Sequence, residues 1–278
     1  MNIKLGVVGG GCVGHATARC FIEHVDEVRV FDVVRERATH SLDETLACDL
    51  IMLALPTPQK SDSLECDTSA IEDFFEARTL NGVRPHANAN YVIRSTVPVG
   101  FTRRMASEYN LPNLCHSPEF LTARVAVTDA QLPARNIVGD PTPAKFNSAA
   151  KILEGLYRLR FPGVPCIVCT SDESEFVKLM QNGFFATKIA YFNEMQQYAA
   201  ANGLDWSVVL GAMLLDGRIS HSHTKVPGPD GKYGFGPDTP QNCLKKDLAN
   251  LITCIKGAGQ TPHVTLAAHT RNVEDRKR

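Results

Sequence analysis

Three glycines near the N-terminus constrain the fold of this chain more than any other feature. Gly9, Gly11 and Gly14 follow the apolar run Ile3–Val8 and open a helical pattern that extends to about His24. In this context the first glycine permits a tight turn, the second lets a pyrophosphate approach the backbone, and the third lets helix and strand pack closely. The sequence therefore predicts an α/β domain that binds a dinucleotide.

An acidic residue after the next predicted strand indicates which dinucleotide binds. Asp32 follows the strand Val28–Phe31. A carboxylate at this position binds the adenosine ribose hydroxyls and repels the extra phosphate of NADP, so NAD is favoured although Arg35 lies nearby. The predicted NAD contacts in this segment are Gly9, Gly11, Cys12, Val13, Gly14 and Asp32.

Strands and helices alternate as far as Cys169. Further strands are predicted at Leu50–Leu55, Tyr91–Arg94, Asn136–Val138 and Val164–Val168, and helices at Thr68–Leu80, Thr102–Tyr109 and Pro143–Arg158. Unbroken apolar runs are typical of strands buried on both faces of a parallel sheet. The alternation predicts a Rossmann-type, doubly wound parallel sheet in a domain spanning residues 1–170.

The pattern is helical after Cys169. Thr170 and Glu173 can form a capping box at the start of a long helix that extends to about Asn202. Further helices are predicted at Trp206–Leu215, Lys245–Lys256 and Pro262–Asn272, and the Gly/Pro-rich residues 226–240 predict a loop. Residues 171–278 are therefore predicted to form a helical central domain, with apolar helix surface that suggests at least a dimer.

Composition excludes several classes of protein. The net charge of −1 provides no basic surface for nucleic acid, and no apolar run approaches the length of a membrane span. The N-terminus does not resemble a signal peptide, and nine scattered cysteines indicate reduced thiols, so we expect a cytoplasmic protein. Cys166 and Cys169 form a lone Cys-x-x-Cys, which we interpret as strand residues rather than a metal or redox site; no metal is expected.

The segment Cys243-Leu244-Lys245-Lys246-Asp247 brings a nucleophile, a cation and a carboxylate together. Cys243 and Asp247 are four residues apart and share one face of a helix. With a nucleotide cofactor, such a thiol suggests oxidation through a covalent thioester, because a thiol traps an aldehyde as a thiohemiacetal that can lose a second hydride. The alternative is a core cysteine beside a solvated charge pair.

Lys178 and Asn182 are also four residues apart, on the long predicted helix. A lysine among apolar residues can serve as a base or stabilise an oxyanion. The alternative is a polar pair on the helix surface.

Several motifs in this order resemble the UDP-glucose/GDP-mannose dehydrogenase family, over about Ile3 to Asn272. They are Leu55-Pro56-Thr57-Pro58, Ser95-Thr96-Val97-Pro98-Val99-Gly100, Ser117-Pro118-Glu119-Phe120-Leu121, Lys178-x-x-x-Asn182, Phe192-Asn193-Glu194, Gly234-Phe235-Gly236 and Cys243-Leu244-Lys245-Lys246-Asp247. The resemblance implies a four-electron oxidation of the C6 alcohol of a nucleotide sugar, such as UDP-glucose, to the carboxylate with two NAD.

The resemblance also implies residue roles. Cys243 is the nucleophile, Lys178 and Asn182 stabilise the oxyanion, Asp247 and Thr96 organise water and proton transfer, and Glu119 is the base that hydrolyses the thioester. Further NAD contacts are implied at Pro56, Thr57, Ser95, Thr96 and Lys246. Substrate contacts are implied at Glu119, Phe120, Leu121, Lys178, Asn182, Gly236 and Arg218, the last resembling an arginine that reaches the substrate of a neighbouring subunit.

Some residues depart from the family pattern. Ala123 stands where the family has a carboxylate, Lys245 stands where it has proline, and residues 237–242 form a longer loop than usual before the cysteine. The sequence ends where the family's central linking helix ends, so the resemblance is to a shortened member without the C-terminal nucleotide-sugar domain.

Two other functions fit parts of the pattern. A single-step dehydrogenase of the β-hydroxyacid type also uses a lysine and an asparagine four residues apart, and would leave Cys243 idle. A non-catalytic NAD-binding subunit would need no catalytic residues, whereas this chain keeps the whole set. Two, one or no NADH released per substrate would distinguish the three.

We expect NAD to bind more tightly than NADP, because the Asp32 carboxylate faces the ribose and repels a 2′-phosphate. Calorimetric titration of both dinucleotides measures the preference. Equal or tighter binding of NADP would contradict it and would identify Arg35 as the residue that binds the phosphate.

Overall fold

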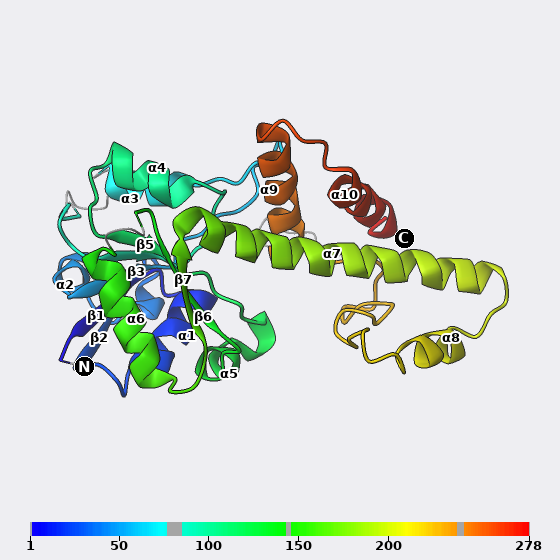
Figure 1. Cartoon of the computed structure of the whole chain (residues 1–278), viewed down its shortest axis with the longest axis horizontal. Helices are drawn as coiled ribbons and strands as arrows, with labels where there is room; N and C mark the ends of the chain where they lie inside the picture. The colour runs from blue at the N-terminus through cyan, green and yellow to red at the C-terminus, as the bar shows by residue number, and fades with distance from the viewer. Residues whose placement is uncertain (1, 77–84, 143–145, 238–241, 278) are drawn as a thin grey trace. The chain divides into compact units, whose positions relative to one another are not determined.

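A computed structural model describes residues 2–76, 85–142, 146–237 and 242–277, and the chain forms two compact units (Figure 1). The first unit contains Met1–Thr57 and Asp67–Lys178, and the second contains Pro58–Cys66 and Leu179–Arg278. The two units are joined within one continuous helix, α7 (Ser171–Ala201). The domain boundary predicted between residues 170 and 171 stays a prediction.

The first unit contains a seven-stranded sheet in the order β2-β1-β3-β4-β5-β6-β7. The strands are β1 (Lys4–Val8), β2 (Glu27–Phe31), β3 (Leu50–Leu53), β4 (Tyr91–Ile93), β5 (Leu114–His116), β6 (Asn136–Asp140) and β7 (Cys166–Thr170). Neighbouring strands are parallel except β5 and β6, which pair antiparallel where His116 faces Gly139. The predicted doubly wound sheet is confirmed, with this antiparallel pair and the unpredicted β5 as additions.

The alternation of buried side chains along β3 explains why the sheet has helices on both faces. Leu50 and Met52 pack in one apolar cluster with α1 (Cys12–Phe21) and α6 (Ser148–Arg160). Ile51 and Leu53 point to the opposite face and pack in a second cluster, with α3 (Ser69–Phe75) and α4 (Phe101–Glu108). Both faces of the strand are therefore covered (Figure 1).

Two short helices were not predicted, α2 (Leu42–Leu46) and α5 (Ala126–Gln131). Residues 77–80 of the helix predicted at Thr68–Leu80, and residues 143–145 of the one predicted at Pro143–Arg158, lie outside the described residues. None of the described helices combines the length and apolar sequence needed to cross a membrane.

The strand order places one edge of the sheet where a ligand can bind. β1 lies between β2 and β3, so the chain reverses its direction of winding at this point. In such sheets ligands bind at the carboxyl ends of the strands beside the reversal. The segments that follow β1, β3 and β4 here are the glycine-rich turn Gly9–Gly14, the loop Leu55–Thr57 and the loop Ser95–Gly100.

The second unit is built around the later part of α7 with α8 (Trp206–Met213), α9 (Cys243–Gly257) and α10 (His263–Asp275). Its apolar cluster contains Ala186, Ala190, Phe235, Leu248, Ile252 and Ala268. Gly183 on α7 lets α9 pack closely, because a Cβ there would lie 2.6 Å from Leu251. The segment Pro58–Cys66 belongs to this unit and adds Leu64 to the cluster.

Capping fixes the start of α7 as predicted. The Glu173 amide donates to Thr170 Oγ1 at 3.2 Å, and the Thr170 amide donates to the Glu173 carboxylate at 2.8 Å. This reciprocal pair is the capping box predicted from the sequence.

One turn further along α7, a buried carboxylate caps a second helix. The two oxygens of Glu175 accept the amides of Gly100 at 2.6 Å and Thr102 at 2.8 Å, at the start of α4. Burial raises the pKa of Glu175 to about 7. The contact fixes the loop that follows β4 to α7.

We expect Glu175→Ala to lower the free energy of unfolding by about 2 kcal/mol, because two amides at the start of α4 lose their acceptor. Chemical denaturation at neutral pH measures the change. Asp172→Ala is the control, since it removes a partly exposed ion pair with Arg103 and a long hydrogen bond from Ser171 Oγ, and it should cost about 0.5 kcal/mol. Equal losses in the two variants would show that the Glu175 cap contributes little.

Candidate functional site

The glycine-rich turn after β1 has the geometry that a dinucleotide needs. Gly9 has φ +99°, and a Cβ there would lie 2.4 Å from the Ala54 carbonyl oxygen. A Cβ on Gly14 would lie 1.7 Å from the Gly9 carbonyl oxygen, whereas one on Gly11 would meet no atom within 4 Å. Gly9 and Gly14 therefore serve the turn and its packing, and the space at Gly11 is open.

The start of α1 faces this open space. No side chain caps α1 and no acidic residue lies in its first turn, so its first amides and the positive end of its dipole suit a phosphate group. Cys12 and Val13 are the first two residues of the helix, and Cys12 is exposed. These features fit the pyrophosphate of NAD.

Asp32 is held against the same turn. Its carboxylate accepts the Gly10 amide at 2.7 Å and the Val34 amide at 2.7 Å. Arg35, three residues after Asp32, begins an exposed 3₁₀ turn. The carboxylate is thus fixed beside the predicted ribose position.

Hydrogen bonds connect the loops after β3 and β4. Ser95 Oγ donates to the Leu55 carbonyl at 2.6 Å, and Thr57 Oγ1 donates to the Thr96 carbonyl at 2.8 Å. Thr57, Ser95 and Thr96 are buried, while Pro56 is exposed. The four residues predicted to contact NAD from these loops therefore form one connected group.

A buried ion pair joins the loop after β5 to α7. Lys178 Nζ lies 3.0 Å from Glu119 Oε1, and the two side chains are 4% and 9% exposed. The Leu121 amide donates to the other carboxylate oxygen at 2.6 Å, and Lys178 Nζ lies 5.5 Å from the centre of the Phe120 ring. Lys178 is therefore not a surface residue.

The environment of Glu119 favours its charged form. Burial raises the pKa of Glu119, but the Lys178 ammonium, the Leu121 amide and the Arg94 guanidinium more than offset burial, so the pKa lies below its usual value. Glu119 also acts on the glycine-rich turn: after burial, its charge is the second cause that raises the pKa of Cys12. The charge of Glu119 therefore reaches the start of α1 in the glycine-rich turn.

A second buried cluster joins α7 to α9 within the helical unit. Asp247 accepts hydrogen bonds from Asn182 Nδ2 at 2.6 Å and from Lys246 Nζ at 2.6 Å. Burial lowers the pKa of Lys246, but the Asp247 carboxylate outweighs burial, and the net pKa is raised. The side chain of Asp247 is 1% exposed, so the alternative of a solvated charge pair is wrong. Asn182 is 6% exposed, so the alternative of a surface position for it is also wrong.

Cys243 is the first residue of α9, two residues earlier than the predicted start, because the Asn242 side chain caps the helix by accepting the Lys245 amide at 2.9 Å. The thiol is exposed, one helical turn before Asp247, and interacts electrostatically with Lys246. The alternative of a core cysteine is therefore wrong.

The glycine loop that precedes Cys243 is held by α7 and α10, which the sequence did not indicate. Asn193 accepts the Gly234 amide at 2.9 Å, and Asn272 accepts the Phe235 amide at 2.6 Å. A Cβ on Gly236 would lie 2.4 Å from the Arg276 guanidinium carbon. Gly236 is thus required by an arginine of its own unit, and a substrate contact there stays a prediction.

Arg218 and the loop before Cys243 were also predicted to take part in the site. Arg218 is 87% exposed and forms an ion pair with Asp216, so its role at a neighbouring subunit stays a prediction. Most of the long loop predicted before Cys243, residues 238–241, lies outside the described residues.

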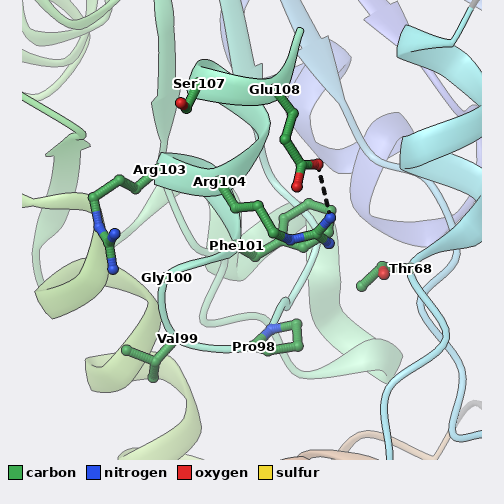
Figure 2. Close-up of a pocket in the computed structure, with 9 residues that line it drawn as sticks. All are labelled: Thr68, Pro98, Val99, Gly100, Phe101, Arg103, Arg104, Ser107 and Glu108. Atoms are coloured by element: carbon green, nitrogen blue, oxygen red, sulfur yellow. Dashed lines mark hydrogen bonds and ion pairs between the residues drawn. The ribbon is translucent and has the colours of Figure 1, made fainter.

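A cavity of about 600 Å³ lies beside α4 (Figure 2). Its two arginines are already paired, Arg103 with Asp172 at 3.0 Å and Arg104 with Glu108 at 3.0 Å. The amides at the start of α4 are occupied by Glu175. None of the predicted catalytic or binding residues lines this cavity, so we do not assign it to the candidate site.

Comparison with known proteins identifies the family. Residues 34–159 match the UDP-glucose/GDP-mannose dehydrogenase family, NAD binding domain, and residues 172–274 match the central domain of the same family. These matches cover the segments that contain the Glu119–Lys178 and Asn182–Asp247 contacts.

Individual relatives agree with this match. The chain is 27% identical to a UDP-glucose 6-dehydrogenase of Campylobacter jejuni over 82% of this chain and 54% of that protein. It is 26% identical to one of Streptococcus pneumoniae over 93% of this chain and 73% of that protein. A solved UDP-glucose dehydrogenase of Pyrobaculum islandicum superposes with a TM-score of 0.81 at 25% identity, over 99% of this chain and 68% of that one. The chain thus spans about half to three quarters of these proteins, and it belongs to the UDP-glucose/GDP-mannose dehydrogenase family.

Proposed function

We propose that this protein oxidises the C6 alcohol of a nucleotide sugar to the carboxylate, with NAD, through a thioester on Cys243. The observation that carries the proposal is the arrangement on α9, where an exposed Cys243 precedes by one turn a buried Asp247 held by Asn182 and Lys246. A structural cysteine would need neither exposure nor a neighbouring cation.

The first step is oxidation of the alcohol to an aldehyde. NAD, when bound, accepts the hydride from C6 in each of the two oxidation steps. The hydroxyl proton passes to water that Asp247 and Thr96 organise, and Lys178 and Asn182 donate to the oxygen as negative charge develops. Lys178 and Asn182 are four residues apart on α7, so they lie on one side of the same helix.

The second step uses the thiol. Cys243 Sγ attacks the aldehyde carbon to form a thiohemiacetal, and loss of the second hydride converts this adduct to a thioester. A cation beside a cysteine favours the thiolate, which is the nucleophile. Lys246 supplies such a charge next to Cys243.

The third step releases the product. Glu119 removes a proton from water, the resulting hydroxide attacks the thioester carbonyl, and the carboxylate leaves as Cys243 regains its thiol. A base must be ionised to accept a proton, and the pKa of Glu119 lies below its usual value because Lys178 and its hydrogen bonds outweigh the effect of burial. The ion pair thus keeps Glu119 charged within a buried site.

Two parts of the chain are proposed to hold the ligands. For NAD they are the glycine-rich turn with Asp32, the connected loops that contain Pro56, Thr57, Ser95 and Thr96, and Lys246. For the sugar nucleotide they are Phe120, Leu121, Gly236 and Arg218 with the catalytic residues. The two relatives are named UDP-glucose 6-dehydrogenase, which supports UDP-glucose as the substrate to test first.

We expect Cys243→Ala to abolish formation of the acid, because the thiol is needed after the aldehyde forms, and to leave NAD binding unchanged. Counting the NADH released per UDP-glucose measures the outcome, with two expected for the unmodified protein. Cys254→Ala, on the same helix, is the matched control and should release two. Two NADH from Cys243→Ala would exclude the thioester, while one or none from the unmodified protein would favour a single-step dehydrogenase or a non-catalytic subunit.

We also propose a homodimer through the helical unit. Phe184, Tyr191 and Tyr198 are 62%, 51% and 63% exposed, and their spacing of seven residues places them along one side of α7. α8 is apolar around its circumference and has no buried residue, which is typical of a helix covered by a partner. A second copy of the chain would cover both surfaces.

If the dimer forms through this surface, we expect Tyr191→Glu to shift the protein to monomer at micromolar concentration, because an uncompensated charge would be buried at the interface. Sedimentation equilibrium measures the mass. Lys151→Glu, an exposed change on α6, is the control. A monomeric unmodified protein, or a variant that still dimerises, would contradict the proposed surface.

A further inference from the structure

Arg94 is a buried cation that the proposed reaction does not yet use. It follows β4 directly, precedes the loop residues Ser95 and Thr96, and is 9% exposed. Its Nη1 donates to the Ser117 carbonyl at 2.8 Å, to Ser117 Oγ at 2.9 Å and to the Tyr157 hydroxyl at 2.8 Å. Ser117 Oγ and the Tyr157 hydroxyl are themselves hydrogen-bonded at 2.8 Å.

All three acceptors of Arg94 are neutral. Arg94 has no ion-pair partner within the described part of the chain, and its buried Nε has no hydrogen-bond partner there. An unpaired buried charge is costly to remove from water, and its field on nearby groups is only weakly screened there. The nearby carboxylate on which its field acts is Glu119.

Ser117 connects Arg94 to Glu119 through the backbone. Only Pro118 separates Ser117 from Glu119 in the sequence, and its ring restricts the backbone between them. Because Arg94 holds both the carbonyl and the hydroxyl of Ser117, it fixes the point from which the Glu119 side chain reaches Lys178. The Tyr157 hydroxyl on α6 accepts from the same Arg94 nitrogen and so helps to hold the guanidinium.

We propose that Arg94 is a positioning residue for Glu119, acting through its two hydrogen bonds to Ser117 and through a positive charge that no described carboxylate pairs. The inference rests on the proposed role of Glu119 as the base of thioester hydrolysis. Arg94 touches neither substrate nor cofactor in this proposal, and it acts on the reaction through the orientation and ionisation of Glu119.

The charged and titratable groups around Glu119 come from four segments of the chain. Lys178 on α7 pairs with it directly, Arg94 after β4 acts on it through space, and Cys12 on α1 responds to its charge. His116 on β5 adds no further cation at neutral pH, because burial lowers its pKa to about 3. When Arg94 is removed, Lys178 is therefore the remaining cation that lowers the pKa of Glu119 against the effect of burial.

The test uses the full chain with UDP-glucose and NAD, and three variants of one residue. Arg94→Met removes both the charge and the hydrogen bonds, Arg94→Gln removes the charge and keeps a polar group, and Arg94→Lys keeps the charge. Arg160→Met is the control, because Arg160 is a partly buried arginine of α6 that donates to the Cys20 carbonyl. NADH bursts, mass spectrometry of the Cys243 adduct and the pH profile of turnover are measured.

For Arg94→Met we expect a normal burst of two NADH per site, followed by steady-state turnover reduced about 10- to 100-fold, less than the loss of a base itself. The thioester adduct on Cys243 should accumulate. Turnover falls on the acid side as Glu119 protonates, so this limb should move to higher pH in Arg94→Met and Arg94→Gln but not in Arg94→Lys. A purely structural arginine would not move the limb.

The outcomes separate this inference from the function on which it rests. If Glu119→Gln accumulates the adduct while Arg94→Met and Arg94→Gln hydrolyse it at the normal rate with an unshifted limb, the role of Arg94 is wrong. If Arg94→Met does not fold, the comparison of Arg94→Gln with Arg94→Lys decides by the same two readouts. If the unmodified protein forms no adduct on Cys243 at all, the proposed function itself fails.

Discussion

The buried ion pair between Glu119 and Lys178 is the interaction on which the part of the candidate site in the first unit depends. Two charges that are almost fully removed from water are tolerated when each has a close partner and further hydrogen bonds, and here the distance is 3.0 Å with the Leu121 amide as a third partner. The pair connects the loop after β5 to α7. It also favours the charged form of Glu119, which the proposed chemistry requires.

α7 acts as the common support of the predicted catalytic residues. Within the first unit it supplies Glu175, which fixes the loop after β4, and Lys178, which fixes Glu119. Within the second unit, the same helix supplies Asn182, which binds Asp247 on α9. Within each unit, α7 thus contributes one side chain that holds a predicted catalytic carboxylate.

Sequence patterns predicted the parts of the structure that depend on local chemistry. The glycine-rich turn needs residues without a Cβ at Gly9 and Gly14, and the capping box needs Thr170 and Glu173 three residues apart. Two features could have been predicted from local spacing. Ser41 and Glu44 have the same capping spacing and begin α2. Glu175 lies about one turn before Lys178 on the same helix, which placed it near the candidate site. The short strand β5 has three residues, too few for a periodic pattern to identify.

By itself, then, the sequence determined the α/β class, the glycine-rich turn and the helical second half, and it supplied the candidate catalytic residues, because these follow from spacing along one element. The tertiary structure decided which of these residues are buried and what they touch. Lys178 and Asn182 could equally have formed a surface pair, and only packing of the loop after β5 and of α9 gave them the partners Glu119 and Asp247. The position of Arg94 behind Ser117 likewise depends on elements distant in sequence, β4, β5 and α6, whose contacts no local pattern records.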